Sequence, residues 1–339
     1  MMAFTAIVGC ATEPSLPAEQ PGVAVPRNAG SCGFGEFSQC VVWSPDSKEL
    51  FAVESMGQSA FGLIAIDPST LAVRFIGAIE YPARLEIAAA DPEAIYYSTS
   101  ITGTSYGIHR YAFSNGNARQ LAQASPSSEF SISRDGSRLA FHPAGSTRTA
   151  DTIAVIDVAT TDRVATRAAY DADIGEFSPD GANLIVTSGM TKWTAVWNMA
   201  SGSFTEVKRP VTLSFGVLRA ARWDGDVLRG LFVPLVASSS LKDVGFYSGD
   251  TLAYAPVPYP DLVAWVPSME SAFVTRAAGT CQSTADCGER HFELRYTSST
   301  TTALLGSINA WFFTTFAPSP DGKWLAYKAI DRPLYLIER

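Results

Sequence analysis

A short turn motif recurs along the chain at a nearly constant interval, and this interval limits the possible folds more than any other feature. The clearest copies occupy residues 44–50, 133–139, 178–184 and 319–325. Weaker copies occupy residues 91–92, 224–225 and 267–269. The reference positions 46, 91, 135, 180, 224, 268 and 321 are separated by 45, 44, 45, 44, 44 and 53 residues. A period of about 40 to 45 residues is typical of architectures that repeat one small unit of secondary structure.

Each copy of the motif has the chemistry of a hairpin turn. In Ser178-Pro179-Asp180-Gly181, proline presets the backbone of the first corner, aspartate bonds nearby amides and glycine accepts a positive φ. Runs rich in strand-forming residues surround this copy at 174–177, 184–187, 194–197 and 204–207. Four strands in each 44-residue repeat predict an all-β fold, a seven-bladed β-propeller of four-stranded antiparallel blades.

The Ser-Pro-Asp-Gly hairpins resemble the WD-like repeats of TolB-type β-propellers, and the resemblance covers about residues 32–339. It implies a fold but no activity, because propellers serve as scaffolds, receptors and enzymes. After its turn, the last repeat provides strands at 324–329 and 334–337, and the chain then ends without a strand for the outer position of the blade. We expect residues 22–26 to close this last blade as an N-terminal strand, since proline is tolerated at an outer edge.

The N-terminus resembles the lipobox of bacterial lipoproteins. Residues 1–10 end in Ile7-Val8-Gly9-Cys10, and a proline-rich stretch follows. The resemblance implies a signal peptide over residues 1–9, acylation of Cys10 and a tether over residues 10–31, so we expect a periplasmic or cell-surface envelope protein held only by its lipid anchor. Residues 1–9 contain no Lys or Arg, unlike the positive start of a signal peptide. The alternatives are an upstream start codon and an ordinary apolar tail.

The other four cysteines form two local pairs, Cys32 with Cys40 and Cys281 with Cys287. An even number at short spacing predicts two disulfides in an exported protein. Free thiols are the alternative, and neither pair has the C-x-x-C spacing of a zinc site.

Both cysteine pairs are expected in the loops of one face of the propeller, near the junction of the last and first blades. We expect this face to carry the partner site, with Phe34, Phe37, Trp311 and Phe312 as its aromatic contacts. The alternative is that the disulfides only protect long loops from proteolysis.

Charged residues precede several of the turns, in strands expected to face the central channel. They are Arg84, Glu86, Glu129, Glu176, Arg219 and Arg222. These residues are candidates for a polar ligand site at the channel mouth. Their distances from the reference aspartate differ in parity, and a shift of one residue turns a side chain to the opposite face. Unless bulges intervene, some of them lie between blades and serve structural hydrogen bonding.

Catalytic, metal and nucleic-acid sites have little support in this sequence. The G-x-S-x-G pattern at 103–107 joins two expected strands rather than a strand and a helix. The three histidines lie in different repeats, and the net charge of −8 opposes binding to phosphate backbones. We therefore expect a monomeric, non-catalytic scaffold without cofactor or metal, which binds a protein or an extracellular ligand. The alternative is a lactonase-like hydrolase with its site at the channel mouth.

Overall fold

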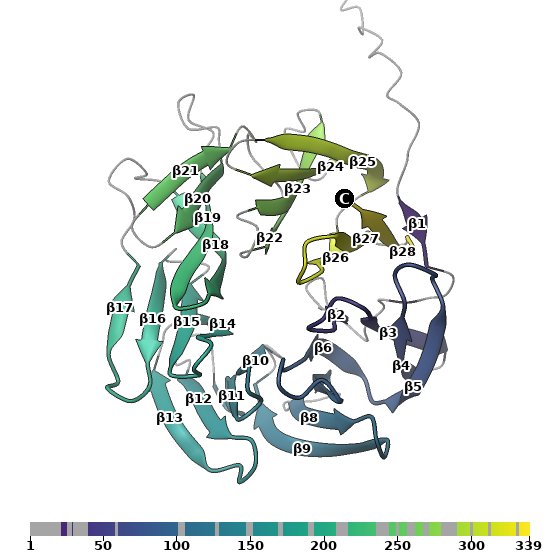
Figure 1. The fold of residues 1–339 in the computed structure, drawn as a ribbon. Helices are drawn as coiled ribbons and strands as arrows, with labels where there is room; N and C mark the ends of the chain where they lie inside the picture. The colour runs from purple at the N-terminus through teal and green to yellow at the C-terminus, as the bar shows by residue number, and fades with distance from the viewer. Residues whose placement is uncertain are drawn as a thin grey trace, which may run out of the picture.

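The computed structural model describes residues 22–25, 29, 40–57, 60–100, 106–125, 129–146, 152–168, 172–188, 193–207, 216–234, 244–248, 251–255, 262–266, 271–278, 290–298, 301–310, 313–329 and 332–339. In these residues every regular element is a β-strand. The strands form seven four-stranded antiparallel sheets around a central axis (Figure 1). The chain is therefore an all-β propeller with four-stranded antiparallel blades, as the repeat predicted.

In six of the sheets the strands follow one another along the chain from the axis outward, and in the last sheet the outermost strand is β1. The first three sheets are β2 (Val41–Trp43), β3 (Leu50–Gly57), β4 (Ala60–Ile66), β5 (Val73–Ile79); β6 (Pro82–Glu86), β7 (Ala94–Ser100), β8 (Tyr106–Ala112), β9 (Asn117–Ala124); and β10 (Phe130–Ile132), β11 (Arg138–Phe141), β12 (Thr152–Asp157), β13 (Arg163–Ala168). The next two are β14 (Ala172–Phe177), β15 (Asn183–Ser188), β16 (Thr194–Asn198), β17 (Phe204–Glu206); and β18 (Gly216–Asp224), β19 (Val227–Pro234), β20 (Val244–Ser248), β21 (Thr251–Ala255). The last two are β22 (Leu262–Val266), β23 (Ser271–Ala278), β24 (Arg290–Ser298), β25 (Thr302–Ala310); and β26 (Phe313–Pro318), β27 (Trp324–Ala329), β28 (Leu334–Glu338) with β1 (Val23–Ala24).

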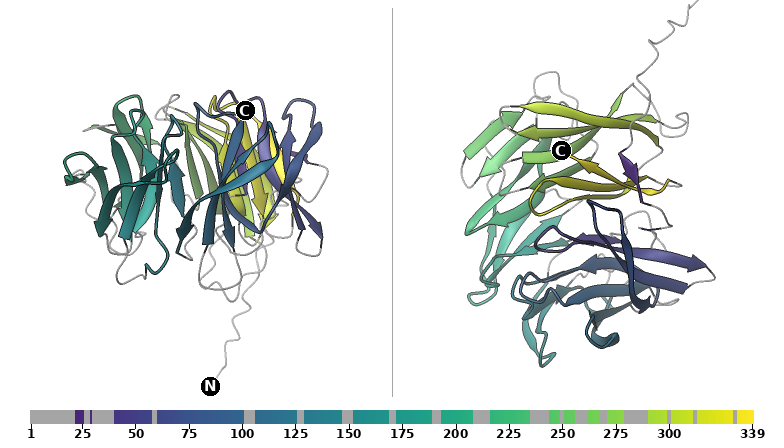
Figure 2. Two further views of the ribbon diagram at one scale, coloured as in Figure 1. Left: turned by 90° about the horizontal axis from the view of Figure 1, so that it is seen from below. Right: turned by 45° about the vertical axis from the view of Figure 1, so that its right-hand side comes forward.

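The recurring motif forms the turn between the first and second strands of a sheet. In the first copy, Ser44 Oγ donates to Asp46 Oδ1 at 2.8 Å and accepts the Glu49 amide at 2.9 Å. The copies at 133, 178 and 319 have the same serine–aspartate bond. Gly181 has a φ of 68°, which explains the glycine of the motif. We call the end of the ring that carries these turns the turn face, and the opposite end the loop face; the strands run between them (Figure 2).

The last sheet takes its outermost strand from the N-terminal segment. β1 pairs antiparallel with β28, Val23 lies opposite Leu336, and the Val25 amide donates to Leu334 O at 2.8 Å. Val25 is buried against the first and last sheets. The two ends of the chain are therefore joined within one sheet.

The hydrophobic core lies in layers between neighbouring sheets. Tyr96 of β7 packs with Phe130 of β10 and Phe141 of β11, and all three are buried. Phe51 of β3 packs in the same manner with Tyr97 of β7. Among the residues that the structure describes, no helix is long and apolar enough to cross a bilayer.

Four innermost strands contain an irregularity in their pairing with the second strand. The register shifts lie at Pro82/Arg84 in β6, Ile174/Phe177 in β14, Arg219/Arg222 in β18 and Phe313/Thr315 in β26. A bulge re-aims the side chains next to it. In β14, a Cβ on Gly175 would lie 2.9 Å from Ile185 O, so the strands approach too closely there for a larger residue. Of the charged positions whose parities disagreed, Glu176 therefore lies within a bulge, and Arg84, Arg219 and Arg222 border one.

Candidate functional site

Two charged residues of β6 connect the second sheet to the third. Arg84 Nη2 donates to Glu86 Oε1 at 2.6 Å, and Glu86 Oε2 accepts the Ile132 amide of β10 at 2.9 Å. The Arg84 guanidinium lies 5.8 Å from the centre of the Phe130 ring. The Glu86 and Arg84 side chains are only 17% and 22% exposed. Glu86 therefore satisfies a backbone donor of the neighbouring sheet.

Glu176 of β14 makes an equivalent connection between the fourth and fifth sheets. Its Oε2 accepts the Trp223 amide of β18 at 3.1 Å, and its carbonyl oxygen accepts Trp223 Nε1 at 3.3 Å. Glu176 lies in the irregular part of β14, between Ile174 and Phe177. The bulge thus brings a carboxylate to an innermost strand whose backbone needs an acceptor.

Burial raises the pKa of Glu86 above its ordinary value. Arg84 and the Ile132 amide oppose this rise, and the negative charge of Glu176 adds to it. Two carboxylates of the innermost strands, in the second and fourth sheets, therefore influence each other electrostatically. Such a pair favours a neutral or cationic neighbour over an anionic one.

The other predicted channel residues have different positions. Arg222 is exposed on β18, and Arg219 belongs to the same strand and pairs with Leu231. Glu129 is half-buried just before β10. The structure brings together Arg84 and Glu86, with Glu176 near enough to act electrostatically.

The predicted loop-face residues lie largely outside the described part of the chain. This applies to Cys32, Phe34, Phe37, Cys281, Cys287, Trp311 and Phe312, and Cys10, the predicted lipidation site, also lies outside the described residues. Cys40 is described: it is 1% exposed and immediately precedes β2. Its pairing with Cys32, like the second disulfide, stays a prediction.

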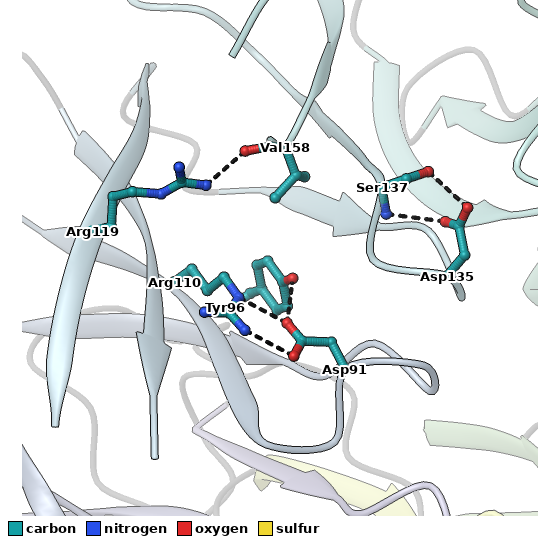
Figure 3. A network of polar contacts seen from close by, with 7 residues as sticks. All are labelled: Asp91, Tyr96, Arg110, Arg119, Asp135, Ser137 and Val158. Atoms are coloured by element: carbon teal, nitrogen blue, oxygen red, sulfur yellow. Dashed lines mark hydrogen bonds and ion pairs between the residues drawn. The ribbon is translucent and has the colours of Figure 1, made fainter. Parts of the chain in front are cut away.

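A groove of about 570 Å³ opens on the turn face between the second and third sheets. On one wall, Arg110 donates from Nε and Nη2 to the two carboxylate oxygens of Asp91, each at 2.8 Å, and Tyr96 Oη donates to Asp91 at 2.8 Å (Figure 3). The Arg110 guanidinium lowers the pKa of the Asp91 carboxyl. This wall is therefore a neutral, fixed ion pair.

The other wall of the groove belongs to turns of the third sheet. Asp135 accepts the amide and hydroxyl of Ser137, at 3.0 and 2.7 Å, and Arg119 of β9 reaches across to donate to Val158 O at 2.7 Å (Figure 3). Asp157 also lines the groove. The groove thus offers both charges to a polar ligand. In the sequence, Asp91 and Asp135 are recognisable only as turn residues, and Arg110 and Arg119 were not predicted because they belong to no turn motif.

The three histidines lie apart. His109 stacks on Tyr97 with ring centres 5.2 Å apart, His142 Nδ1 contacts Thr152 O at 3.3 Å, and His291 Nδ1 contacts Asn309 Oδ1 at 3.0 Å. Each therefore has a local packing or hydrogen-bonding partner. Within the part of the chain that the structure describes, no three metal-ligating side chains converge.

No protein-family profile and no curated protein sequence matches this chain. Solved structures do resemble it. An oligogalacturonate lyase from Vibrio parahaemolyticus aligns with a TM-score of 0.67 at 9% identity, covering 93% of this chain and 92% of the lyase. The β-propeller domain of the Trilobed protease from Pyrococcus furiosus aligns with a TM-score of 0.60 at 10% identity, covering 90% and 94%.

The β-propeller domain of Cps50 (Swd1) from Myceliophteria thermophila aligns with a TM-score of 0.55 at 11% identity, covering 93% of this chain and all of that domain. At such low identities these similarities establish the WD40-like or TolB-type propeller fold and nothing about activity. The Pyrococcus propeller is described as having an open velcro topology. In the present chain, β1 pairs with β28.

Proposed function

We propose that this protein is a non-catalytic binding scaffold of the bacterial envelope, in which the seven sheets act as the blades of one closed ring. Its loop face binds a partner protein or an extracellular ligand through Phe34, Phe37, Trp311 and Phe312, which the sequence places in loops of that face. The protein is a monomer anchored through an acylated Cys10.

The observation that carries this proposal is the use of the inner-strand carboxylates. Glu86 and Glu176 each accept a backbone amide of the next sheet, and Glu86 also pairs with Arg84. A general acid or base at the channel mouth must instead be available to a substrate proton. The hydrogen bonds that hold the ring together occupy the residues that a channel hydrolase would use, and this favours binding over catalysis.

The anchor and the ring are close together in sequence. Residues 11–21 separate Cys10 from Gly22, the first described residue before β1. Twelve Cα-to-Cα steps span at most about 40 Å when fully extended. An acylated Cys10 would therefore hold the propeller near the bilayer while the ring stays free to turn.

The anchor is tested by metabolic labelling with a radioactive fatty acid. We expect label in the wild type and none in Cys10→Ala, because acylation needs the thiol. Equal labelling of the two proteins, or a protein found only in cytosol, contradicts the anchor.

The scaffold is tested in intact cells by crosslinking wild type and Trp311→Ala. We expect a discrete crosslinked partner with the wild type and its loss in the variant, while both proteins melt cooperatively at similar temperatures. Hydrolysis of lactones by the pure wild-type protein, abolished in Glu86→Gln and Glu176→Gln, would instead establish the channel hydrolase.

A further inference from the structure

The groove on the turn face between the second and third sheets is lined by two arginines from neighbouring strands. Arg110 of β8 lies directly opposite Arg119 of β9 in the strand pairing. Side chains in such opposite positions lie on the same face of a sheet, and like charges there repel each other. Asp91 neutralises Arg110 through two hydrogen bonds of 2.8 Å. The repulsion therefore favours a second anion, beside Arg119.

Arg119 keeps most of its hydrogen-bonding capacity. Its Nη2 donates to Val158 O at 2.7 Å (Figure 3). Among the described residues, no carboxylate pairs with Arg119, and its Nε and Nη1 have no acceptor. A guanidinium has five N–H groups, and a carboxylate can accept two of them at once. Because Arg119 is exposed, a carboxylate from outside the chain can reach it.

Asp157 supplies an acceptor on the opposite wall of the groove. Its Oδ1 accepts the amides of Ala159 and Thr160, each at 2.9 Å, and the Thr160 hydroxyl at 3.3 Å. Its Oδ2 accepts no bond from the part of the chain that the structure describes. The Thr160 amide holds the pKa of Asp157 below its ordinary value of 3.8, so the carboxylate is charged at neutral pH.

The unused groups of Arg119 and Asp157 lie near each other without forming an ion pair. Arg119 binds the carbonyl oxygen of Val158, the residue that follows Asp157 in the chain. The connections on the turn face of these two sheets, residues 87–93, 113–116, 133–137 and 158–162, all belong to the described part of the chain. None of them supplies a partner for Arg119 Nη1 or Asp157 Oδ2. The groove therefore presents one positive and one negative group to a ligand.

The charge of the groove selects against a purely anionic ligand. Three aspartates and two arginines line it, so three negative charges against two positive ones leave a net charge of −1. A ligand with only a carboxylate or a phosphate would add to this negative charge, whereas one that also carries an ammonium group would not. The volume of about 570 Å³ lies within the range of about 300 to 1,000 Å³ found for small-molecule sites.

We propose that the turn-face groove binds a small zwitterionic molecule, an amino acid or a short peptide with free ends. The ligand carboxylate accepts from Arg119, and the ligand ammonium donates to Asp157. Ala90, Val158 and Ala159 line the groove between these groups and supply apolar contacts. This site lies on the face opposite the proposed partner site, so it does not depend on the scaffold function.

The probe is trialanine with both ends free, titrated into the full chain by isothermal calorimetry. N-acetyl-trialanine lacks the ammonium group and trialanine amide lacks the carboxylate, so each removes one of the two proposed contacts. Free alanine distinguishes an amino acid site from a peptide site, and inorganic sulfate tests binding of a plain anion.

The variants Arg119→Gln and Asp157→Asn remove the two charges from the protein side. Asparagine keeps an oxygen for the amides of Ala159 and Thr160, so the turn after β12 is preserved. Arg74→Gln is the matched control, because Arg74 is an exposed arginine of the outer strand β5 that pairs with Glu49 and does not line the groove.

We expect trialanine to bind the wild type and Arg74→Gln equally. It should bind Arg119→Gln and Asp157→Asn at least about tenfold more weakly, because a hydrogen bond to a charged group contributes about a factor of ten or more in affinity. Each analogue should bind the wild type more weakly by a similar factor, which tests the site even if a variant unfolds. Alanine that binds with the same dependence on both charges also supports the proposal and assigns the site to amino acids.

Three results would overturn the zwitterion site. The first is trialanine and alanine both failing to bind the wild type. The second is equal binding of N-acetyl-trialanine and trialanine, since the ammonium group then has no role. The third is binding of trialanine that persists unchanged in Arg119→Gln and Asp157→Asn. Sulfate that binds in place of both zwitterions, and is lost in Arg119→Gln, would show a plain anion site instead.

Discussion

Replacing Glu86 by alanine should destabilise the ring at the junction of the second and third sheets. The change removes the acceptor of the Ile132 amide and the partner of Arg84. An unsatisfied buried donor costs about 1 to 3 kcal/mol, and a fully buried ion pair that loses one member costs about 3 to 5 kcal/mol. These side chains are 17% and 22% exposed, so water compensates in part. We therefore expect a loss of about 2 to 3 kcal/mol in the free energy of unfolding.

Replacing Glu86 by glutamine separates the hydrogen bond from the charge. The amide oxygen can still accept the Ile132 amide, so at neutral pH we expect a change of less than about 1 kcal/mol. Burial raises the pKa of Glu86, so the folded state holds its proton more tightly than the unfolded state. The stability that this group contributes is then greatest below its ordinary pKa of 4.5 and declines as pH rises through the folded pKa. The wild type should therefore lose stability relative to Glu86→Gln as the pH rises from 4.5.

Urea unfolding at several pH values, followed by circular dichroism, measures both effects. For a chain of this length, the alanine variant should also melt about 3 to 5 °C lower than the wild type. Glu206→Ala on the outer strand β17 is the matched control, because Glu206 is exposed, and it should change stability by less than about 0.5 kcal/mol. Equal stability of Glu86→Ala and Glu206→Ala would refute the connecting role of Glu86.

Three further predictions concern the bulge, the closing strand and the turns. Gly175→Ala should lose about 1 to 3 kcal/mol in urea unfolding, because its Cβ would lie 2.9 Å from Ile185 O; unchanged stability would mean that β14 and β15 can separate freely. Deleting residues 21–27 should lower the melting temperature by at least about 5 °C, since it removes β1 and the buried Val25; an unchanged melting temperature would show that the last blade is stable with three strands. The bonds to Lys48 and Ser44 lower the pKa of Asp46 from 3.8 to about 2, so its contribution is present above pH 3.8 and is lost as pH falls toward 2. Asp46→Asn should flatten this part of an acid titration of stability, and an unchanged titration would contradict the assignment.

The repeat predicted the fold because its chemistry is local. In the clearest copies serine, aspartate and in most cases glycine stand within four residues and build the turn by their own hydrogen bonds and φ preference, as in residues 178–181, and strand patterns lie on both sides. The spacing of the turns then gives the size of each unit. The pairing of β1 with β28 could also be foreseen, because the last repeat lacks a strand and a strand-like segment stands near the N-terminus.

The positions of the charged side chains could not be predicted in the same way. Glu86 stands an odd number of residues before the reference aspartate of its repeat, and Glu176 an even number before its own. In a regular strand their side chains would therefore point to opposite faces, yet both accept an amide of the next sheet. The bulge between Ile174 and Phe177 contains Glu176 and changes its count, and a bulge depends on the register of the neighbouring strand rather than on local sequence. The ion pair between Asp91 and Arg110 is hidden for a related reason. The two residues are 19 positions apart, Asp91 in the turn before β7 and Arg110 on β8, so the register of the strands decides whether they meet.

The inner strands and the outer strands of the sheets differ in how closely they must match a neighbouring sheet. Each repeated turn and inner-strand carboxylate must match a neighbouring sheet, so a change there propagates to the next blade through bonds such as that of Glu86 to Ile132. The outer strands are constrained on one side only, because each of them pairs with a single strand of its own sheet. Arg74 in β5, Arg119 in β9 and Arg163 in β13 stand in such strands, and charges at a sheet edge oppose its pairing with other chains. The outer strands therefore tolerate charge where the inner strands need a matched acceptor.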